Sequence, residues 1–179
     1  QVERLSNASV DLSRGYRISV KDEILFSVTA ALERLNSFGV KESPQGIEIK
    51  LGKLSTNVLA AGAYQLSVTS DHIEVLANDH SGWFYGIQSL AAMVKLPQLK
   101  VPHVKITDAP RFEFRGLLLD VARNFRSQSF VLKVLDQMAA YKMNKLHFHL
   151  ADDEGWRLQI PDLPELTEVG GFRCFDPQE

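Results

Sequence analysis

The stretch RGLLLDVARNF, residues 115–125, contains a near-continuous apolar run that ends in charged and polar side chains. A run of this kind is typical of a parallel strand that is covered on both faces. A second apolar strand, KLHFHL at 145–150, follows a segment at 127–143 whose apolar residues recur with helical spacing. Strand, helix and strand in this order predict a βαβ unit with parallel strands and a right-handed crossover.

The helix expected between these strands is amphipathic. Ser127 or Ser129 is placed to cap its first turn. The residues that we expect to face the strands are Val131, Val134, Leu135 and Met138.

A charged residue follows each of the two strands: Arg123 in LDVARNF and Asp152 in HFHLADDEGWR. The carboxyl ends of parallel strands meet on one rim, which is where ligands bind in α/β folds. A guanidinium offers several donors and a carboxylate offers only acceptors, so together they suit vicinal hydroxyls. A salt bridge that joins two loops is the alternative interpretation of the same spacing.

The histidines His147 and His149 share one face of the second strand, because side chains alternate along a strand. An H-x-H pattern beside Asp152 and Asp153 is one way to build a metal site. The favoured interpretation is that both histidines belong to the core and make their hydrogen bonds within the protein. We expect neither a metal nor another cofactor. Strict alternation aligns Asp153 rather than Asp152 with the histidines, so both carboxylates remain candidates.

Two further residues near these strands admit two interpretations each. Asp120 lies within an apolar run, where a carboxylate needs a partner. Trp156 offers a surface for stacking a sugar, although an anchor for the following loop is the favoured role. Arg111 and Arg115 precede the first strand, at the opposite rim, and are expected to be structural.

The first 108 residues have a different pattern, which predicts an α+β domain with two helices on an antiparallel sheet. Residues 1–14 are polar and are expected to be irregular. The predicted strands are YRISV at 16–20, GIEIKLG at 46–52, and a hairpin that turns at Ser70 and Asp71.

The two helices of this domain have recognisable ends. The first is expected to begin after Asp22, to place Ile24, Val28, Ala31, Leu32 and Leu35 on one stripe, and to stop at Gly39. In the second, SGWFYGIQSLAAMVKL, the glycines Gly82 and Gly86 indicate close packing on the sheet. The segment LPQLKVPHVKITDAP at 96–110 then predicts a linker or an edge strand.

The composition excludes several classes of function. Hydrophobic residues make up 45% and charged residues 23% of the 179-residue chain, as in ordinary globular proteins. The net charge of -2 provides no basic surface for nucleic acid or for an anionic membrane. No apolar run approaches the ~18 residues of a membrane span, and no secretory signal opens the chain.

The two ends of the sequence also carry expectations. The chain starts at Gln1 rather than at a methionine, which favours a processed product or an excised piece. The single cysteine, Cys174, has no partner for a disulfide within the sequence. It is therefore either a free thiol or half of a disulfide whose second cysteine lies elsewhere.

Three long motifs follow one another between Asp108 and Cys174: DAPRFEFRGLLLDVARNF, VLDQMAAYKMNKLHFHLADDEGWRLQI and PDLPELTEVGGFRC. They resemble the start of the catalytic barrel of family 20 glycoside hydrolases, the β-N-acetylhexosaminidases, and the bacterial chitobiase branch in particular. A weaker likeness, carried by SGWFYGIQSL, relates the preceding segment to the α+β domain of that family. The resemblance implies an α+β domain at 1–108 and the start of a (β/α)8 barrel at 109–179.

The resemblance also implies roles for single residues. Arg123 matches the arginine that hydrogen-bonds the 3- and 4-hydroxyls of a terminal N-acetylhexosamine. Asp152 matches an active-site aspartate, which favours Asp152 over Asp153. His149 and Trp156 match supporting positions.

The expected reaction is retaining hydrolysis of chitin oligosaccharides in which the 2-acetamido group of the substrate is the nucleophile. An adjacent Asp–Glu pair after the fourth barrel strand assists it, and no comparable pair is found here. A barrel takes ~250 residues, so we expect these residues to hold its first two strands and to be inactive alone. The unpaired strand edge predicts self-association.

Members of this branch are typically exported, so the resemblance implies a periplasmic or cell-surface location. Arg173–Cys174 resembles a chitobiase loop whose cysteine forms a disulfide with a cysteine a little further along the chain. The resemblance thus implies a disulfide partner for Cys174 that is not in this sequence. Two alternatives are a metal-dependent barrel hydrolase that uses His147 and His149, and a non-catalytic carbohydrate-binding module.

Overall fold

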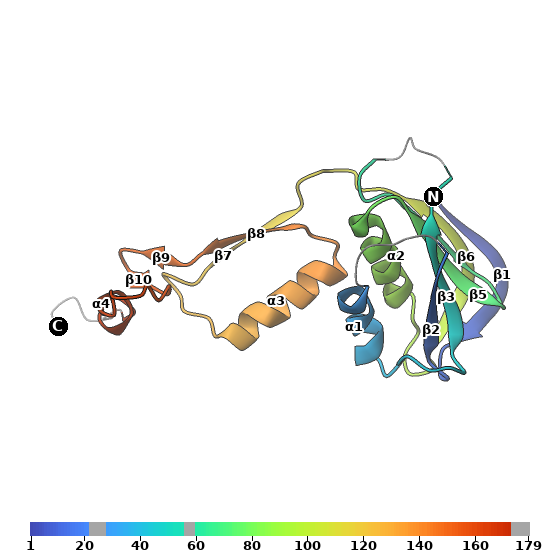
Figure 1. Ribbon diagram of the computed structural model, residues 1–179, viewed down its shortest axis with the longest axis horizontal. Helices are drawn as coiled ribbons and strands as arrows, with labels where there is room; N and C mark the ends of the chain where they lie inside the picture. Colours follow the sequence, from blue (N-terminus) through green and yellow to red (C-terminus); the bar gives the residue numbers. More distant parts are fainter. Residues whose placement is uncertain (22–27, 56–59, 173–179) are drawn as a thin grey trace. The chain divides into compact units, whose positions relative to one another are not determined.

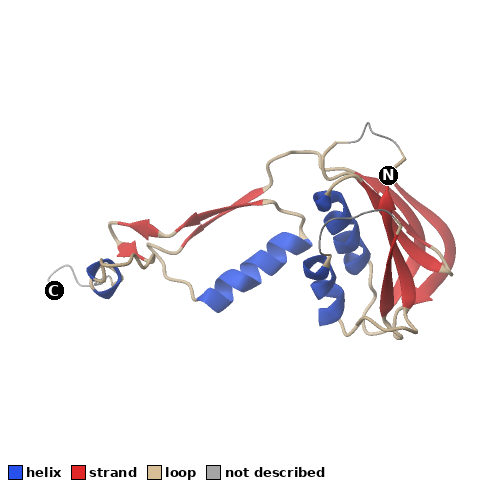
Figure 2. Ribbon diagram, viewed as in Figure 1, coloured by secondary structure: helices blue, strands red, loops and turns tan. Residues whose placement is uncertain are grey.

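The computed structural model describes residues 1–21, 28–55 and 60–172. The chain forms two compact units, Gln1–Glu113 and Phe114–Glu179, whose elements are drawn in Figures 1 and 2. Asp22 and Ile24, which the sequence placed at the start of a helix, lie outside the described residues, as do Arg173 and Cys174. Within the described ranges, no helix is both long enough and apolar enough to cross a membrane.

The first unit is a six-stranded sheet with two helices on one of its faces (Figure 1). The strand order is β1-β6-β4-β5-β3-β2. The elements are β1 (Val2–Asp11), β2 (Tyr16–Val20), α1 (Thr29–Ser37), β3 (Ile47–Lys53), β4 (Tyr64–Val68), β5 (His72–Ala77), α2 (His80–Ala92) and β6 (Lys100–Asp108).

The face of the sheet beneath the helices forms a closed apolar core. Every second residue of β4 and β5 is buried, and the residues between them are half-buried, as a sheet covered on one face requires. The hairpin that the sequence predicted between these strands is confirmed by their antiparallel pairing. Residues at most 1% exposed in β3, β4, β5 and β6 are Ile49, Leu51, Leu66, Val68, Ile73, Val75, Ala77 and Val101.

Helix α2 starts and packs as its sequence indicates. The side chain of Asp79 caps it, because one carboxylate oxygen accepts from Gly82 N at 2.7 Å and the other from Gly62 N at 2.7 Å. At Gly86, a Cβ would lie 2.5 Å from Val75 Cγ1, so only glycine allows this approach to the sheet. The predicted close packing of Gly82 and Gly86 is therefore confirmed.

Helix α1 ends where the sequence predicted. Gly39 follows its last turn with φ of +87°, a left-handed conformation that glycine adopts without strain. The buried residues of the helix are Ala31, Leu32 and Leu35, which belong to the predicted stripe.

The prediction of an antiparallel sheet is wrong in part, because the sheet is mixed. Strand β3 runs parallel to β2 on one side and parallel to β5 on the other. The chain reverses through α1 between β2 and β3, and a crossover of this kind returns the second strand in the same direction. Alternating hydrophobicity reports which face is buried but not the direction of the neighbouring strand.

The expectation of an irregular segment at 1–14 is also wrong, because residues Val2–Asp11 form the edge strand β1. Of its ten residues only Val10 is buried, and the strand is held by pairing with β6. Strand β6 was expected to be a linker or an edge, yet it lies between β1 and β4. The register of β1 shifts between Arg4, which lies opposite Val104, and Ser9, which lies opposite Pro102, a residue with no N–H to donate.

The second unit contains the predicted βαβ arrangement. Its elements are β7 (Gly116–Asp120), α3 (Gln128–Ala140), β8 (Lys145–His149), β9 (Ala151–Asp152), β10 (Gly155–Trp156) and α4 (Glu165–Glu168). Strands β7 and β8 are parallel, with Gly116 opposite Lys145 and Asp120 opposite His149. Ser127 caps α3 by accepting from Phe130 N at 3.3 Å, which decides between the two predicted caps.

The prediction that the first strand is covered on both faces is not met within this chain. Leu118 is 57% exposed and Leu117 is also exposed. Of the helix residues expected to face inward, Met138 is buried, Val131 and Val134 are half-buried, and Leu135 is exposed. A pair of strands is too narrow to cover an apolar helix, and one helix covers only one side of the pair.

Candidate functional site

The structure brings Arg123 and Asp152 together. Arg123 comes three residues after β7 ends, and Asp152 lies in β9, just beyond the end of β8. Arg123 Nη1 donates to Asp152 Oδ2 at 2.6 Å. The two exits of a parallel strand pair thus place a cation and an anion side by side, as their spacing predicted.

Asp120 holds the guanidinium from the other side. Its Oδ2 accepts from Arg123 Nε at 2.5 Å, and its Oδ1 accepts from the backbone N–H groups of Ala122 at 3.0 Å and Arg123 at 3.1 Å. Burial opposes ionisation of Asp120, but the hydrogen bonds from the Arg123 backbone and side chain outweigh it and lower its pKa. Arg123 is therefore oriented by two carboxylates rather than one.

The charge of Asp152 is fixed by its neighbours. Hydrogen bonding with the Asp153 side chain and backbone, then with His149, together with the positive charge of Arg123, outweighs the effect of burial and lowers the pKa of Asp152 to about 2. The Asp153 N–H donates to Asp152 Oδ1 at 2.9 Å, and His149 Nε2 lies 2.8 Å from Asp152 Oδ2. Asp152 is consequently an ionised acceptor at neutral pH, and Asp153 supports it through the backbone.

The pair is open to solvent. The Arg123 side chain is 44% exposed and that of Asp152 is 27% exposed. An exposed ion pair contributes little to folding, because water screens the attraction. The arrangement leaves a guanidinium and two carboxylates held in place where a ligand can approach them.

The other predicted candidates are placed differently. The rings of His147 and His149 are stacked with centroids 6.4 Å apart, but His147 is exposed and only His149 contacts Asp152. Trp156 donates from Nε1 to Leu158 O at 2.5 Å and from its backbone to Gly170 O at 2.7 Å, which fits the predicted loop anchor. Arg115 donates from Nε to Lys142 O at 2.7 Å, so its expected structural role is confirmed.

The sequence also suggested a metal site as an alternative. Among the residues that the structure describes, no group of three or more histidine, cysteine, aspartate or glutamate side chains is arranged to hold a metal ion. His147 and His149 therefore have no third ligand there.

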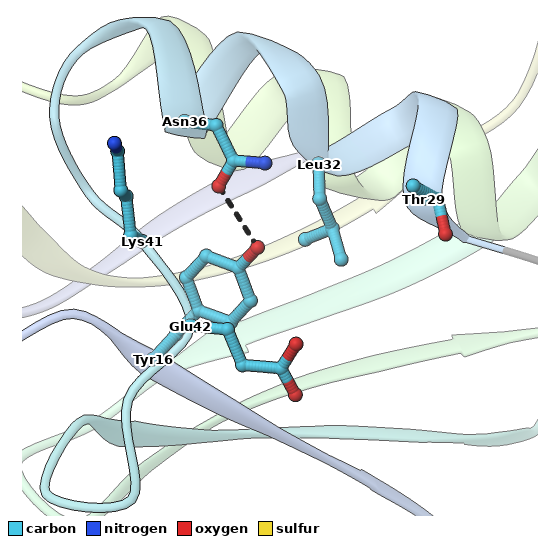
Figure 3. A pocket seen from close by; sticks show the side chains of 6 residues that line it. All are labelled: Tyr16, Thr29, Leu32, Asn36, Lys41 and Glu42. Carbon is cyan, nitrogen blue, oxygen red and sulfur yellow. Dashed lines mark hydrogen bonds between the residues drawn. The ribbon is translucent and has the colours of Figure 1, made fainter.

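A pocket of about 410 Å³ lies in the first unit and contains none of these candidates (Figure 3). The hydroxyl of Tyr16 donates to Asn36 Oδ1 at 3.0 Å within it. Its lining residues are Tyr16, Thr29, Leu32, Asn36, Lys41 and Glu42.

Comparison with known proteins identifies the class to which this fold and site belong. Residues 112–179 match the model of the glycosyl hydrolase family 20 catalytic domain, and residues 1–109 match the model of domain 2 of the same family. The chain therefore belongs to glycosyl hydrolase family 20.

Individual relatives give a narrower picture. The chain is 44% identical over its whole length to beta-hexosaminidase B of Pseudoalteromonas piscicida, covering 23% of that protein. It is 46% identical, over 95% of its length, to N,N'-diacetylchitobiase of Vibrio harveyi and covers 20% of it. The chain thus spans about a fifth of the length of these curated relatives.

Solved structures agree. The exo-β-N-acetylglucosaminidase of Vibrio harveyi, in complex with N-acetylglucosamine, superposes with a TM-score of 0.79 at 32% identity, over 95% of this chain and 27% of that one. The β-N-acetylhexosaminidase of Bacteroides fragilis gives 0.81 at 30% identity, over 100% of this chain and 38% of that one.

Proposed function

We propose that this chain supplies the sugar-binding arginine and aspartate of an exo-β-N-acetylhexosaminidase that acts on chitin oligosaccharides. The observation that carries the proposal is the contact of 2.6 Å between Arg123 and Asp152, at the exits of adjacent parallel strands and in reach of solvent. The names of the relatives support it, since they include a chitobiase and an enzyme solved with N-acetylglucosamine.

The proposed chemistry of binding uses fixed charges. Arg123 donates to the 3- and 4-hydroxyls of the terminal N-acetylhexosamine, while Asp120 and Asp152 fix the plane of its guanidinium. Asp152 accepts from a hydroxyl, and its pKa of about 2 keeps it ionised at neutral pH. Water must leave these groups when the sugar binds, so their prior orientation reduces the free energy needed for reorganisation.

The proposed reaction is retaining hydrolysis by the 2-acetamido group of the substrate, an exception to the scheme with a carboxylate nucleophile. An adjacent aspartate and glutamate orient the acetamido group and protonate the leaving oxygen. We assign neither task to Asp153 and Glu154, because both follow β8, the second strand of the βαβ unit, whereas the pair expected from the resemblance follows the fourth barrel strand. The 179 residues alone should therefore bind a sugar without hydrolysing it.

A chimera tests the proposal. These 179 residues replace the matching segment of the Vibrio harveyi N,N'-diacetylchitobiase, and hydrolysis of a chromogenic N-acetylglucosaminide is measured. We expect the chimera to be active and Arg123→Ala to lower kcat/KM by a hundredfold or more, about 3 kcal/mol.

Lys133→Ala, on the exposed side of α3, is the matched control and should retain full activity. Melting curves of both variants establish that each is folded. Unchanged kcat/KM in a folded Arg123→Ala chimera would contradict the assigned role. Binding of N-acetylglucosamine by the chain, together with a chimera that is folded but inactive, would favour the non-catalytic module instead.

We also propose two features of the longer protein. The boundary between the α+β domain and the barrel is placed between residues 108 and 109, and family matches that end at 109 and begin at 112 support a boundary close to that point. The protein is placed in the periplasm or at the cell surface, in keeping with a polymeric substrate. Fractionation of the source cells with an antibody against this chain would contradict that location if the antigen stayed with the cytoplasm.

A further inference from the structure

Arg157 donates three hydrogen bonds from one guanidinium, and all three acceptors are backbone carbonyls. Nε donates to Val121 O at 2.9 Å, Nη2 donates to Ala122 O at 3.0 Å, and Nη1 donates to Gly171 O. The planar fork of an arginine suits two successive carbonyls, because its donors point in fixed directions. Arg157 thus holds the two residues that immediately precede Arg123.

Arg157 also contacts the chain after Arg123. Its guanidinium carbon lies 5.3 Å from the centroid of the Phe125 ring, a distance typical of a cation–π contact. Arg123 is therefore flanked on both sides by positions that the same guanidinium holds. A change at Arg157 should alter the direction in which the Arg123 side chain leaves the backbone.

The backbone of Arg157 is fixed to the second strand exit. Its N–H donates to Leu150 O at 3.0 Å, and Leu150 follows β8 directly. Gly155 allows the close approach, since a Cβ there would lie 2.5 Å from Ala122 O. Arg157 accordingly connects the exit that carries Asp152 to the exit that carries Arg123.

We infer that Arg157 is a positioning residue, which sets the distance and angle between the Arg123 guanidinium and the Asp152 carboxylate by holding the backbone of both strand exits. Its importance for sugar binding rests on the proposed function, but its effect on the geometry of the pair does not. All the hydrogen bonds described for the Arg157 side chain go to backbone carbonyls and none to Asp120 or Asp152, so it acts through the backbone.

The first test needs no sugar. In the 179-residue chain labelled with ¹⁵N, the Nε–H of Arg123 is hydrogen-bonded to Asp120 and should exchange slowly with water. In Arg157→Gln we expect its exchange to accelerate at least tenfold, and in Arg157→Lys by less, because the charge near Phe125 is kept. Met138→Val is the matched control, since it weakens the core of the same unit without touching the exits.

The second test adds N-acetylglucosamine as the probe. Arg157→Gln should weaken binding to the chain about tenfold, whereas Met138→Val should leave it unchanged at a temperature where both are folded. If the unchanged chain fails to bind the sugar, the proposed function loses support, while the exchange measurement still decides the positioning role. Equal acceleration of Arg123 exchange in Met138→Val and Arg157→Gln would overturn the inference, as would unaltered exchange in a folded Arg157→Gln.

Discussion

The two units differ in how far the apolar side chains of their strands are buried. In the first, six strands and two helices enclose a core in which Leu66, Ile73 and Val75 are completely buried. In the second, two parallel strands and α3 leave Leu118 and Leu135 exposed, and of the residues of α3 only Met138 is buried. Both units contain apolar strands, but only the first has enough neighbouring strands and helices to bury them.

The two units also differ in what holds their residues in place. The first unit has the properties of a self-sufficient domain, because its apolar face is covered by its own helices. The second carries the candidate site, and its order near Arg123 depends on polar contacts, from Asp120, Asp152 and Arg157, rather than on a large core. The large apolar core and the candidate site therefore lie in different units.

The largest expected effect on stability comes from shortening a buried leucine of β4, compared with an exposed leucine of β7. Leu66→Ala should destabilise the first unit by about 3 kcal/mol, because a leucine is replaced within a closed core. Leu118→Ala should change the stability of the second unit by less than about 0.5 kcal/mol, since its side chain is already exposed. Urea unfolding followed by ¹⁹F resonances of fluorotryptophan at Trp83 and Trp156 reports each unit separately. Equal losses would break the comparison.

A second pair of variants compares the helix caps. Asp79→Ala should destabilise the first unit by about 1.5 kcal/mol, because both Gly62 N and Gly82 N lose their acceptor. Ser127→Ala removes one longer hydrogen bond at 3.3 Å and should cost the second unit about 0.5 kcal/mol. The same ¹⁹F experiment measures both, and a larger loss at Ser127 would reverse the ranking.

The exposed apolar surface predicts self-association of the second unit. Each of β7 and β8 has one strand partner among the described residues, which leaves an edge available to another chain. Leu118→Lys should weaken self-association about tenfold in sedimentation velocity, because burying an ammonium group is unfavourable. Val20→Lys is the control, since Val20 is 52% exposed but lies in the first unit. A monomeric unaltered chain at high concentration would contradict the prediction.

The smallest effect concerns pH. The pKa of Asp152 is lowered from 3.8 to about 2, so ionised Asp152 stabilises the folded chain above pH ~4, and this contribution is lost as the pH falls towards 2. Asp152→Asn should remove that dependence from the Trp156 signal and leave the Trp83 signal unaltered. An Asp152 carboxyl resonance that titrates near pH 4 would show that its hydrogen-bond partners do not lower its pKa.

Sequence alone predicted the parts of this structure that depend on local spacing. Apolar runs on either side of an amphipathic helix predicted the parallel pair β7 and β8, and the positions after them placed Arg123 beside Asp152. These predictions succeed because strand direction in a βαβ unit follows from chain connectivity. Asp120 carried a signal too, since a carboxylate in an apolar run requires a partner, but its partner was not identified.

The remaining features have no local signal. Strand β1 is held by backbone hydrogen bonds at an edge, so its exposed side chains show no alternation. The parallel pairing of β3 with β5 depends on where other strands insert. Arg157 binds carbonyls 35 and 36 residues away, and any arginine after a glycine and a tryptophan would look the same in the sequence.

The pairing of β1 with β6 has a consequence for synthesis on the ribosome. Val2 lies opposite Ile106, so β1, once made, finds its neighbour only after about a hundred further residues have been added. At ~5–20 residues per second, that interval lasts roughly 5–20 s. Throughout it, a ten-residue strand has open hydrogen-bonding groups on both sides, and a nascent chain in that condition is a natural client for a chaperone.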